Sequence, residues 1–226
     1  KQTMKRKGLL CAVLALVLLL SAQPTAAALT PPYSQSVEIK GDALVPIISV
    51  TVPTSAEVYI NPLELPVDIG TGRRDYGQIL STPACIANES EVAMQVDLTL
   101  TASLKEESTM RLVTSPTGGS GTEKQAFIYF EIVQSDTDRV RYVEWATAYD
   151  PTNPRHIIIQ DGMSATKTNV MKLPPVTPRG RVAPGGYAPF RMTGDAVTNP
   201  TDEWTEKDGI NVAVAFTFTP LHYRDW

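Results

Sequence analysis

Side chains that could carry catalysis or hold a metal are scarce in this chain. Its two histidines, His156 and His222, have no second ligand at the i+2 or i+4 spacing of zinc sites. Asp136-Thr137-Asp138 begins like a calcium loop but lacks the required glycine and terminal glutamate, so it predicts a hairpin turn. Gly162 to Thr166 has Thr166 where a nucleophile elbow needs glycine. We therefore expect no catalytic residue, no metal and no cofactor, in a protein that is not an enzyme.

Three aromatic residues are the remaining candidates for a binding site. Trp145, Tyr149 and Trp204 lie in or beside predicted loops that contain Pro, Asn and Asp. Such rings can line a site for a glycan. Trp also closes the ends of β-sandwiches, with its ring buried and its N–H hydrogen-bonded. The sequence leaves both interpretations open.

Residues 1–28 have the composition of a secretory leader. Lys5-Arg6-Lys7 is a basic segment, Leu9 to Leu20 is an apolar run, and Ala26-Ala27-Ala28 satisfies the small-residue rule for cleavage. Met4 has the position of an initiator, and Leu29 is the expected mature N-terminus. The apolar run is shorter than the roughly 20 residues that span a bilayer. We expect a signal-peptide helix, cleavage after residue 28, and a secreted or cell-surface protein without membrane contact thereafter.

The cysteine content bears on disulfide formation, and the charge bears on which partners the chain can bind. Cys11 lies in the leader, so Cys85 is alone in the expected mature chain and cannot form an intramolecular disulfide. Its apolar neighbours predict a buried, unreactive thiol. The net charge is −4, and cleavage after residue 28 would make it more negative, because the leader contains four positive charges and no negative ones. Without a stripe of Lys and Arg, binding to nucleic acid is excluded.

Alternating apolar and polar residues define the fold class. The pattern predicts long strands over residues 92–101 and 210–219, because successive side chains of a strand face opposite sides of a sheet. Residues 126–133 are expected to form a strand that is covered on both faces. Residues 142–149 could form a strand or a helical turn, and we favour the strand. Asn88-Glu89-Ser90 supplies turn chemistry and is a formal glycosylation sequon. About ten short strands and no amphipathic helix predict an all-β fold, with residues 29–226 as one antiparallel β-sandwich that is Ig-like, Greek-key or jelly-roll-like.

The segment after the expected cleavage site could take part in assembly. Pro31-Pro32 keeps it extended, and Val37 and Ile39 alternate with polar neighbours. This piece could pair as an edge strand within its own domain. It could also add to the sheet edge of a neighbouring subunit, with Val37 and Ile39 filling pockets there. Both arrangements are open.

Three features together resemble exported surface proteins of Gram-positive bacteria. They are the expected signal peptide, the sequence Val-Thr-Val-Pro at residues 50–53, and the Ile-x-Asn-x-Ser-x-Val-x-x-x-Val pattern from Ile86 to Val96. Similar phrases occur in WxL-domain surface proteins and in the camelysin/TasA biofilm-fibre group. The resemblance implies a structural or adhesive role. We expect a cell-surface or matrix protein, such as a fibre or pilus-like subunit, that contacts itself or other surface proteins; the alternative is an extracellular module that binds glycan or peptide.

Overall fold

The computed structural model describes residues 47–53, 56–70, 74–82, 84–222 and 224–225. These residues all belong to one compact unit. They form β-strands and one 3-10 helix, η1 (Val140–Tyr142), but no α-helix. The expected all-β fold is confirmed for this part of the chain. The predicted leader, residues 1–28, lies outside the described residues.

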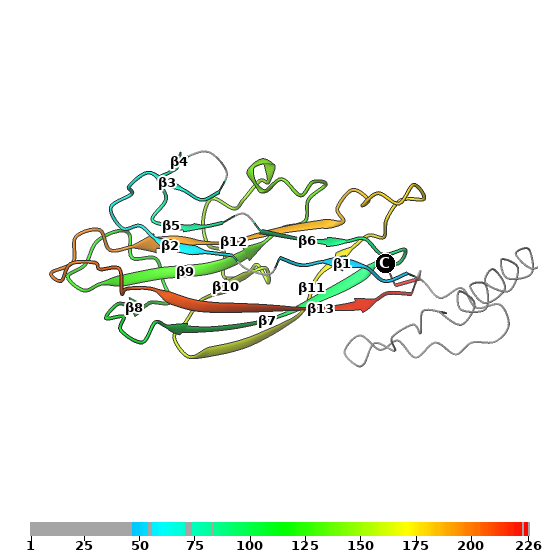
Figure 1. Cartoon of the computed structure of the whole chain (residues 1–226). Helices are drawn as coiled ribbons and strands as arrows, with labels where there is room; N and C mark the ends of the chain where they lie inside the picture. The colour runs from blue at the N-terminus through cyan, green and yellow to red at the C-terminus, as the bar shows by residue number, and fades with distance from the viewer. Residues whose placement is uncertain (1–46, 54–55, 71–73, 83, 223, 226) are drawn as a thin grey trace, which may run out of the picture. The chain divides into compact units, whose positions relative to one another are not determined.

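Two sheets dominate the fold (Figure 1). The larger has the strand order β1-β6-β12-β9-β10, with β8 also paired to β9, and the smaller has the order β11-β7-β13. The larger sheet contains β1 (Val50–Thr51), β6 (Ala84–Asn88), β8 (Arg111–Leu112), β9 (Gln125–Ile132), β10 (His156–Ile158) and β12 (Tyr187–Ala196). The smaller contains β7 (Met94–Leu104), β11 (Met163–Leu173) and β13 (Ile210–Pro220). Two short pairs complete the fold: β2 (Val58–Ile60) with β5 (Ile79–Ser81), and β3 (Val67–Asp68) with β4 (Arg74–Asp75).

The two longest alternating patterns form neighbouring strands, as predicted. β7 and β13 pair antiparallel along their whole length, so that Val214 lies opposite Leu100 and Phe216 opposite Leu98. Leu98, Leu100 and Phe216 belong to the buried core, and Val214 is half-buried against it. The alternation therefore places one apolar face inward and one polar face outward.

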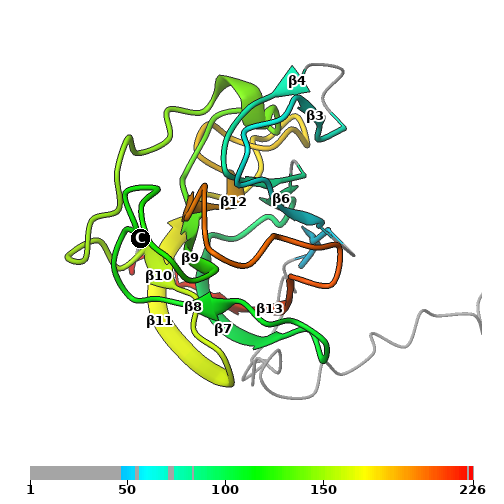
Figure 2. The ribbon, with the colours of Figure 1, turned by 90° about the vertical axis from the view of Figure 1, so that its left-hand side faces the viewer.

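The core lies between the two sheets. Phe190 of β12 and Phe216 of β13 are in contact, with ring centroids 5.3 Å apart, and Phe130 of β9 packs on Phe190 at 5.5 Å. Figure 2 shows β7, β11 and β13 in one layer and β6, β9 and β12 in the other. This arrangement is consistent with a β-sandwich. On the far side of β9 from the core, Phe127 and Tyr129 are also buried, so this strand is covered on both faces as expected.

A buried ion pair holds one end of the molecule together. Lys124, next to β9, donates to Asp208 at 2.9 Å, and their side chains are 7% and 2% exposed. Asp208 also accepts hydrogen bonds from the backbone N–H groups of Thr109 and Thr205. Burial raises the pKa of Asp208, but the bonds from Lys124, Thr205 and Thr109 outweigh it and lower the pKa to about 2. One carboxylate thus joins three segments that are far apart in the sequence.

This carboxylate predicts a specific acid sensitivity. Because the folded-state pKa lies below the ordinary value, Asp208 contributes stability above about pH 4, and loses it as pH falls through about 2. Between these values, the melting temperature of the wild-type protein should fall more steeply than that of Asp208→Asn, which starts lower and has no carboxylate to titrate here. Thermal melts from pH 6 to pH 2 measure this. Parallel curves for the two proteins would contradict the role of Asp208.

Cys85 is half-buried in β6 rather than fully buried as predicted. Burial is the main cause that raises the pKa of its thiol, to about 12. Since the thiolate is the reactive form, we expect maleimide labelling at pH 8 to be about a hundredfold slower in the folded protein than in urea. Equal rates in both states would show that the thiol is not protected by the fold.

Candidate functional site

The segment between β9 and β10, residues 133–155, carries two of the three predicted ligand-binding aromatics. Its first residues bond to β12, whereas Trp145 and Tyr149 pack on side chains of β12 and β9. The expected strand over residues 142–149 is wrong: these residues form the end of η1 and an irregular stretch. The reason is that their backbone groups are used elsewhere. The N–H of Ala146 donates to Oε1 of Glu131 at 2.8 Å instead of entering a sheet ladder.

Glu131 is the centre of a buried polar cluster beneath this segment. Its side chain is 1% exposed and lies 2.9 Å from the guanidinium of Arg191. Arg191 also donates to the carbonyl of Ala146 and lies over the ring of Trp145, 4.5 Å from its centroid. His156 accepts a hydrogen bond from the N–H of Asp150 through Nδ1, and its Nε2 lies 3.5 Å from Oε1 of Glu131. The cluster fixes Trp145 and the chain around it to β9 and β12.

Replacing Glu131 with alanine should therefore loosen the whole segment. We expect a loss of about 2–3 kcal/mol in the free energy of unfolding, because buried partners lose their bonds while Arg191 keeps some contact with water. Limited proteolysis should then cut within residues 134–155. The control is Glu123→Ala, which removes an exposed ion pair with Arg111 and should leave the melting temperature nearly unchanged. An equal loss of stability in the two variants would show that Glu131 does not hold this segment on the sheet.

Tyr149 lies in an aromatic cluster between two cavities. Its ring is 5.3 Å from that of Phe127 and 5.2 Å from that of Tyr129, both edge-on. It lines a cavity of about 650 Å³ and another of about 250 Å³. The larger cavity lies beside β10 and the start of β11, and its other lining residues include Asn153, His156, Gln160, Ser164 and Lys167. The lining thus combines uncharged polar side chains and one lysine with apolar residues such as Pro151 and Met163, beside an aromatic ring.

Trp204 lies on a different segment from Trp145 and Tyr149. It belongs to the loop that joins β12 to β13. Its indole N–H donates to the carbonyl of Val197 at 2.9 Å, and its ring packs against the core. These contacts fit the interpretation that Trp204 closes one end of the fold and does not bind a ligand. The structure thus brings Trp145 and Tyr149 onto one segment but does not bring Trp204 to them. Val37 and Ile39, the strand-addition candidates, lie outside the described residues.

A second surface is the outer face of the three-stranded sheet. Thr99 of β7 is hydrogen-bonded to Thr166 of β11 at 3.0 Å and lies opposite Ala215 of β13. The next row joins Ser164, Thr101 and Ala213. This central part contains only small hydroxyl and methyl side chains, and it is called the hydroxyl face below. Thr101, Ser164, Thr166, Ala213 and Ala215 are exposed.

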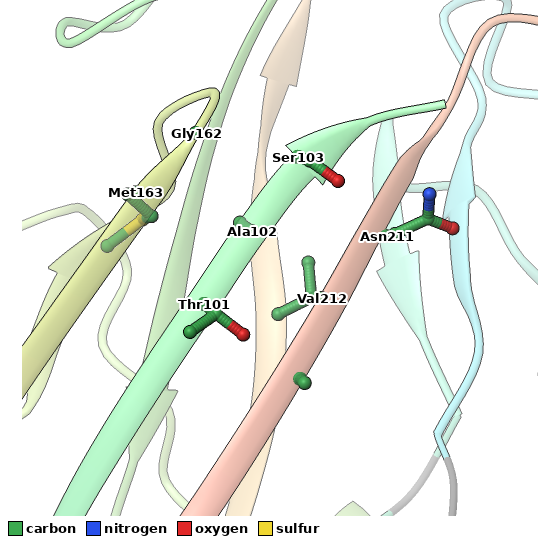
Figure 3. A pocket seen from close by; sticks show the side chains of 8 residues that line it. Thr101, Ala102, Ser103, Gly162, Met163, Asn211 and Val212 are labelled. Carbon is green, nitrogen blue, oxygen red and sulfur yellow. The ribbon is translucent and has the colours of Figure 1, made fainter. Parts of the chain in front are cut away.

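The end of the hydroxyl face is hollowed by a groove of about 340 Å³. Figure 3 shows Thr101 and Ser103 on β7 beside Asn211 and Val212 on β13, with Met163 on β11. Near the other end of the sheet, Asp97 accepts a hydrogen bond from the N–H of Asn169 at 2.7 Å. The two rows of the hydroxyl face contain no charged side chain, so a partner can approach them without removing water from a charge.

Asn88 is completely buried, which bears on the sequon. Its side-chain amide donates to the carbonyls of Val92, Leu173 and Pro174, and its carbonyl accepts from the N–H of Ser90. Both amide hydrogens are thereby used inside the fold. The side chain is not available for glycosylation in the folded protein.

Comparison with known proteins assigns no function to these surfaces. No protein-family model matches the chain, and no curated protein or solved structure shows significant similarity to it. Among the described residues, no group of three His, Cys, Asp or Glu side chains could hold a metal ion. In the same part of the chain, no helix has the length and apolar character needed to cross a bilayer.

Proposed function

We propose that the chain is an exported, non-enzymatic structural or adhesive protein of a bacterial cell surface or extracellular matrix. The observation that carries this proposal is the hydroxyl face, whose rows of Thr, Ser and Ala lie on a regular sheet. Hydroxyl groups donate and accept hydrogen bonds and cost less to desolvate than charged groups do, and small side chains permit close approach of another surface. Such a face suits contact with another protein or with a polysaccharide.

The use of the buried ionisable groups supports a role without catalysis. Glu131 and His156 hold the segment that follows β9, and Lys124 and Asp208 join three loops. Catalytic acids and bases must instead face a substrate. Glu131, Lys124 and Asp208 are directed into the fold. His156 also lines the larger cavity, but it is buried and bonded to the N–H of Asp150.

Export is part of the proposal and rests on the leader-like residues 1–28. The likeness of residues 50–53 and 86–96 to Gram-positive surface proteins supports the same compartment. We propose that the two sheets form an Ig-like or Greek-key sandwich and that its partners are surface proteins, including further copies in a fibre. A fold stabilised by burial, without an intramolecular disulfide, suits a bacterial exported protein.

The test is retention of the full chain, expressed with its leader in an exporting host, on cell walls and matrix material from Gram-positive bacteria. Thr101→Arg places a large charge in the middle of the hydroxyl face and should reduce retention several-fold. The matched control is Thr201→Arg, an exposed threonine in the β12–β13 loop. Wild-type protein that is not retained, or equal retention of the two variants, would refute the proposal.

A second candidate function, capture of a glycan, is favoured by the position of Tyr149 between two cavities. Here the aromatic ring would stack on a sugar while Asn153 and Ser164 bind its hydroxyl groups. A glycan array with Tyr149→Ala should then show loss of a saturable signal. Tyr142→Ala, which changes a 60% exposed tyrosine on the same segment, is the control. No signal from the wild-type protein would dismiss this candidate.

A further inference from the structure

The two outer strands of the three-stranded sheet differ in how they protect their free edges. Edge strands expose unpaired backbone groups, and proteins usually block them with bulges, lysines or proline. β11 has such features: its register on β7 shifts between Lys167 and Met171, and Asn169 has a φ of 54°. Lys167 and Lys172 are exposed on the same strand. β11 is therefore poorly suited to pair with another chain.

β13 has none of these features over its pairing length. Its eleven residues, Ile210–Pro220, contain no charged side chain, and proline occurs only at the last position. Its register on β7 is unbroken from end to end. Among the described residues, no strand pairs with its other side. β13 thus offers a long, regular and uncharged edge.

The inward side chains of β13 are also incompletely covered. Phe216 and Phe218 are buried, whereas Ile210, Val212 and Val214 are only half-buried against the core. A further strand beside β13 would cover part of this apolar surface while satisfying the backbone groups of the edge. The exposed apolar side chains and the unpaired backbone groups therefore both favour the addition of a strand beside β13.

We propose that β13 pairs antiparallel with β13 of a second copy of the chain, which joins two three-stranded sheets into one. This inference rests on the proposed function, because it names the partner of the same sheet. With the two-fold axis at Val214, Val212 lies opposite Phe216 of the other copy, and Ala213 lies opposite its Ala215. Strict alternation then places apolar residues together on the inner face and small residues together on the outer face. The absence of charge in the strand removes any like-charge repulsion across the axis.

The test compares two pairs of exposed lysines in the full chain. Ala213→Lys with Ala215→Lys places like charges opposite each other at the proposed contact, and should weaken self-association measured by light scattering and analytical ultracentrifugation roughly tenfold or more. Ser120→Lys with Thr122→Lys puts the same charges, two residues apart, on the exposed loop between β8 and β9, outside the hydroxyl face, and should leave association intact. A variant with Ala213→Glu and Ala215→Glu should form mixed complexes with the first lysine variant. Melting curves confirm that each variant is folded.

Three results would overturn the proposal. The first is a wild-type protein that stays monomeric at high concentration. The second is equal weakening of self-association by the two lysine pairs, and the third is self-association that depends on residues 37 and 39 instead of β13. The last would appear as loss of association in Val37→Lys with Ile39→Lys while the β13 lysines have no effect. Retention on cell walls separates this inference from the proposed function: monomers that are retained contradict only the β13 contact, whereas dimers that are not retained contradict only the surface role.

Discussion

Replacing Asn88 with alanine is expected to lower the free energy of unfolding by about 3–5 kcal/mol. The substitution removes the partner of four backbone groups that are buried or partly buried, and each buried group left without a bond costs on the order of 1–3 kcal/mol before relaxation. Those groups are the carbonyls of Val92, Leu173 and Pro174 and the N–H of Ser90. The loss should appear in urea denaturation as a lower midpoint with little change in slope.

Two further variants make the Asn88 result specific. Asn88→Asp keeps the size and one acceptor oxygen but removes both donors, so it should also be strongly destabilised. Asn211→Ala changes an exposed asparagine and should leave the midpoint close to that of the wild type. An Asn88→Ala protein as stable as Asn211→Ala would show that the buried amide does not hold these segments together.

Replacing Phe216 with alanine should cost a similar amount, about 3–5 kcal/mol, the range for large-to-small changes in a packed core. Phe216 is 7% exposed and touches Phe190 of the opposite sheet and Phe218 of its own strand. Its loss would leave a cavity where the two sheets meet. Val214→Ala, on the same strand at a half-buried position, should cost less. An unchanged melting curve for Phe216→Ala would contradict the shared core.

The long strands could be predicted from sequence because their signal is local. A period of two over ten residues identifies β7 and β13 and also tells which face is buried. Even so, the pattern does not say which strands are neighbours. The pairing of β11 with β7 depends on residues about 70 positions apart, such as Thr99 and Thr166. Residues 163–173 of β11 lack the long apolar–polar alternation that identifies β7.

The error over residues 142–149 has a physical origin in Glu131. A carboxylate on an otherwise apolar strand needs buried donors, and it takes the N–H of Ala146 together with Arg191. That demand makes the covering segment irregular. The one local signal was the charge itself, a glutamate at a buried position of a strand that is apolar on both faces. Asn88 gave a similarly weak signal, because its sequence reads equally well as an exposed turn.

The candidate surfaces were only partly visible in the sequence. Trp145 and Tyr149 are close in sequence and lie on one segment, but nothing local shows that Trp145 packs under Arg191 while Trp204 packs on the core. The hydroxyl face arises only when three strands align their polar sides. Such a surface is a property of the sheet, and no single strand contains it.

Amide hydrogen exchange of the full chain, free and bound to the cell-wall or matrix material that retains it, tests the surface role most directly. The hydroxyl face predicts slower exchange along β11 and β13 on binding, at the edges of the three-stranded sheet, with residues 145–156 unchanged. Slower exchange at Tyr149 and the neighbouring residues 150–156, with β11 and β13 unaffected, would contradict this account and place the contact at the aromatic cavity.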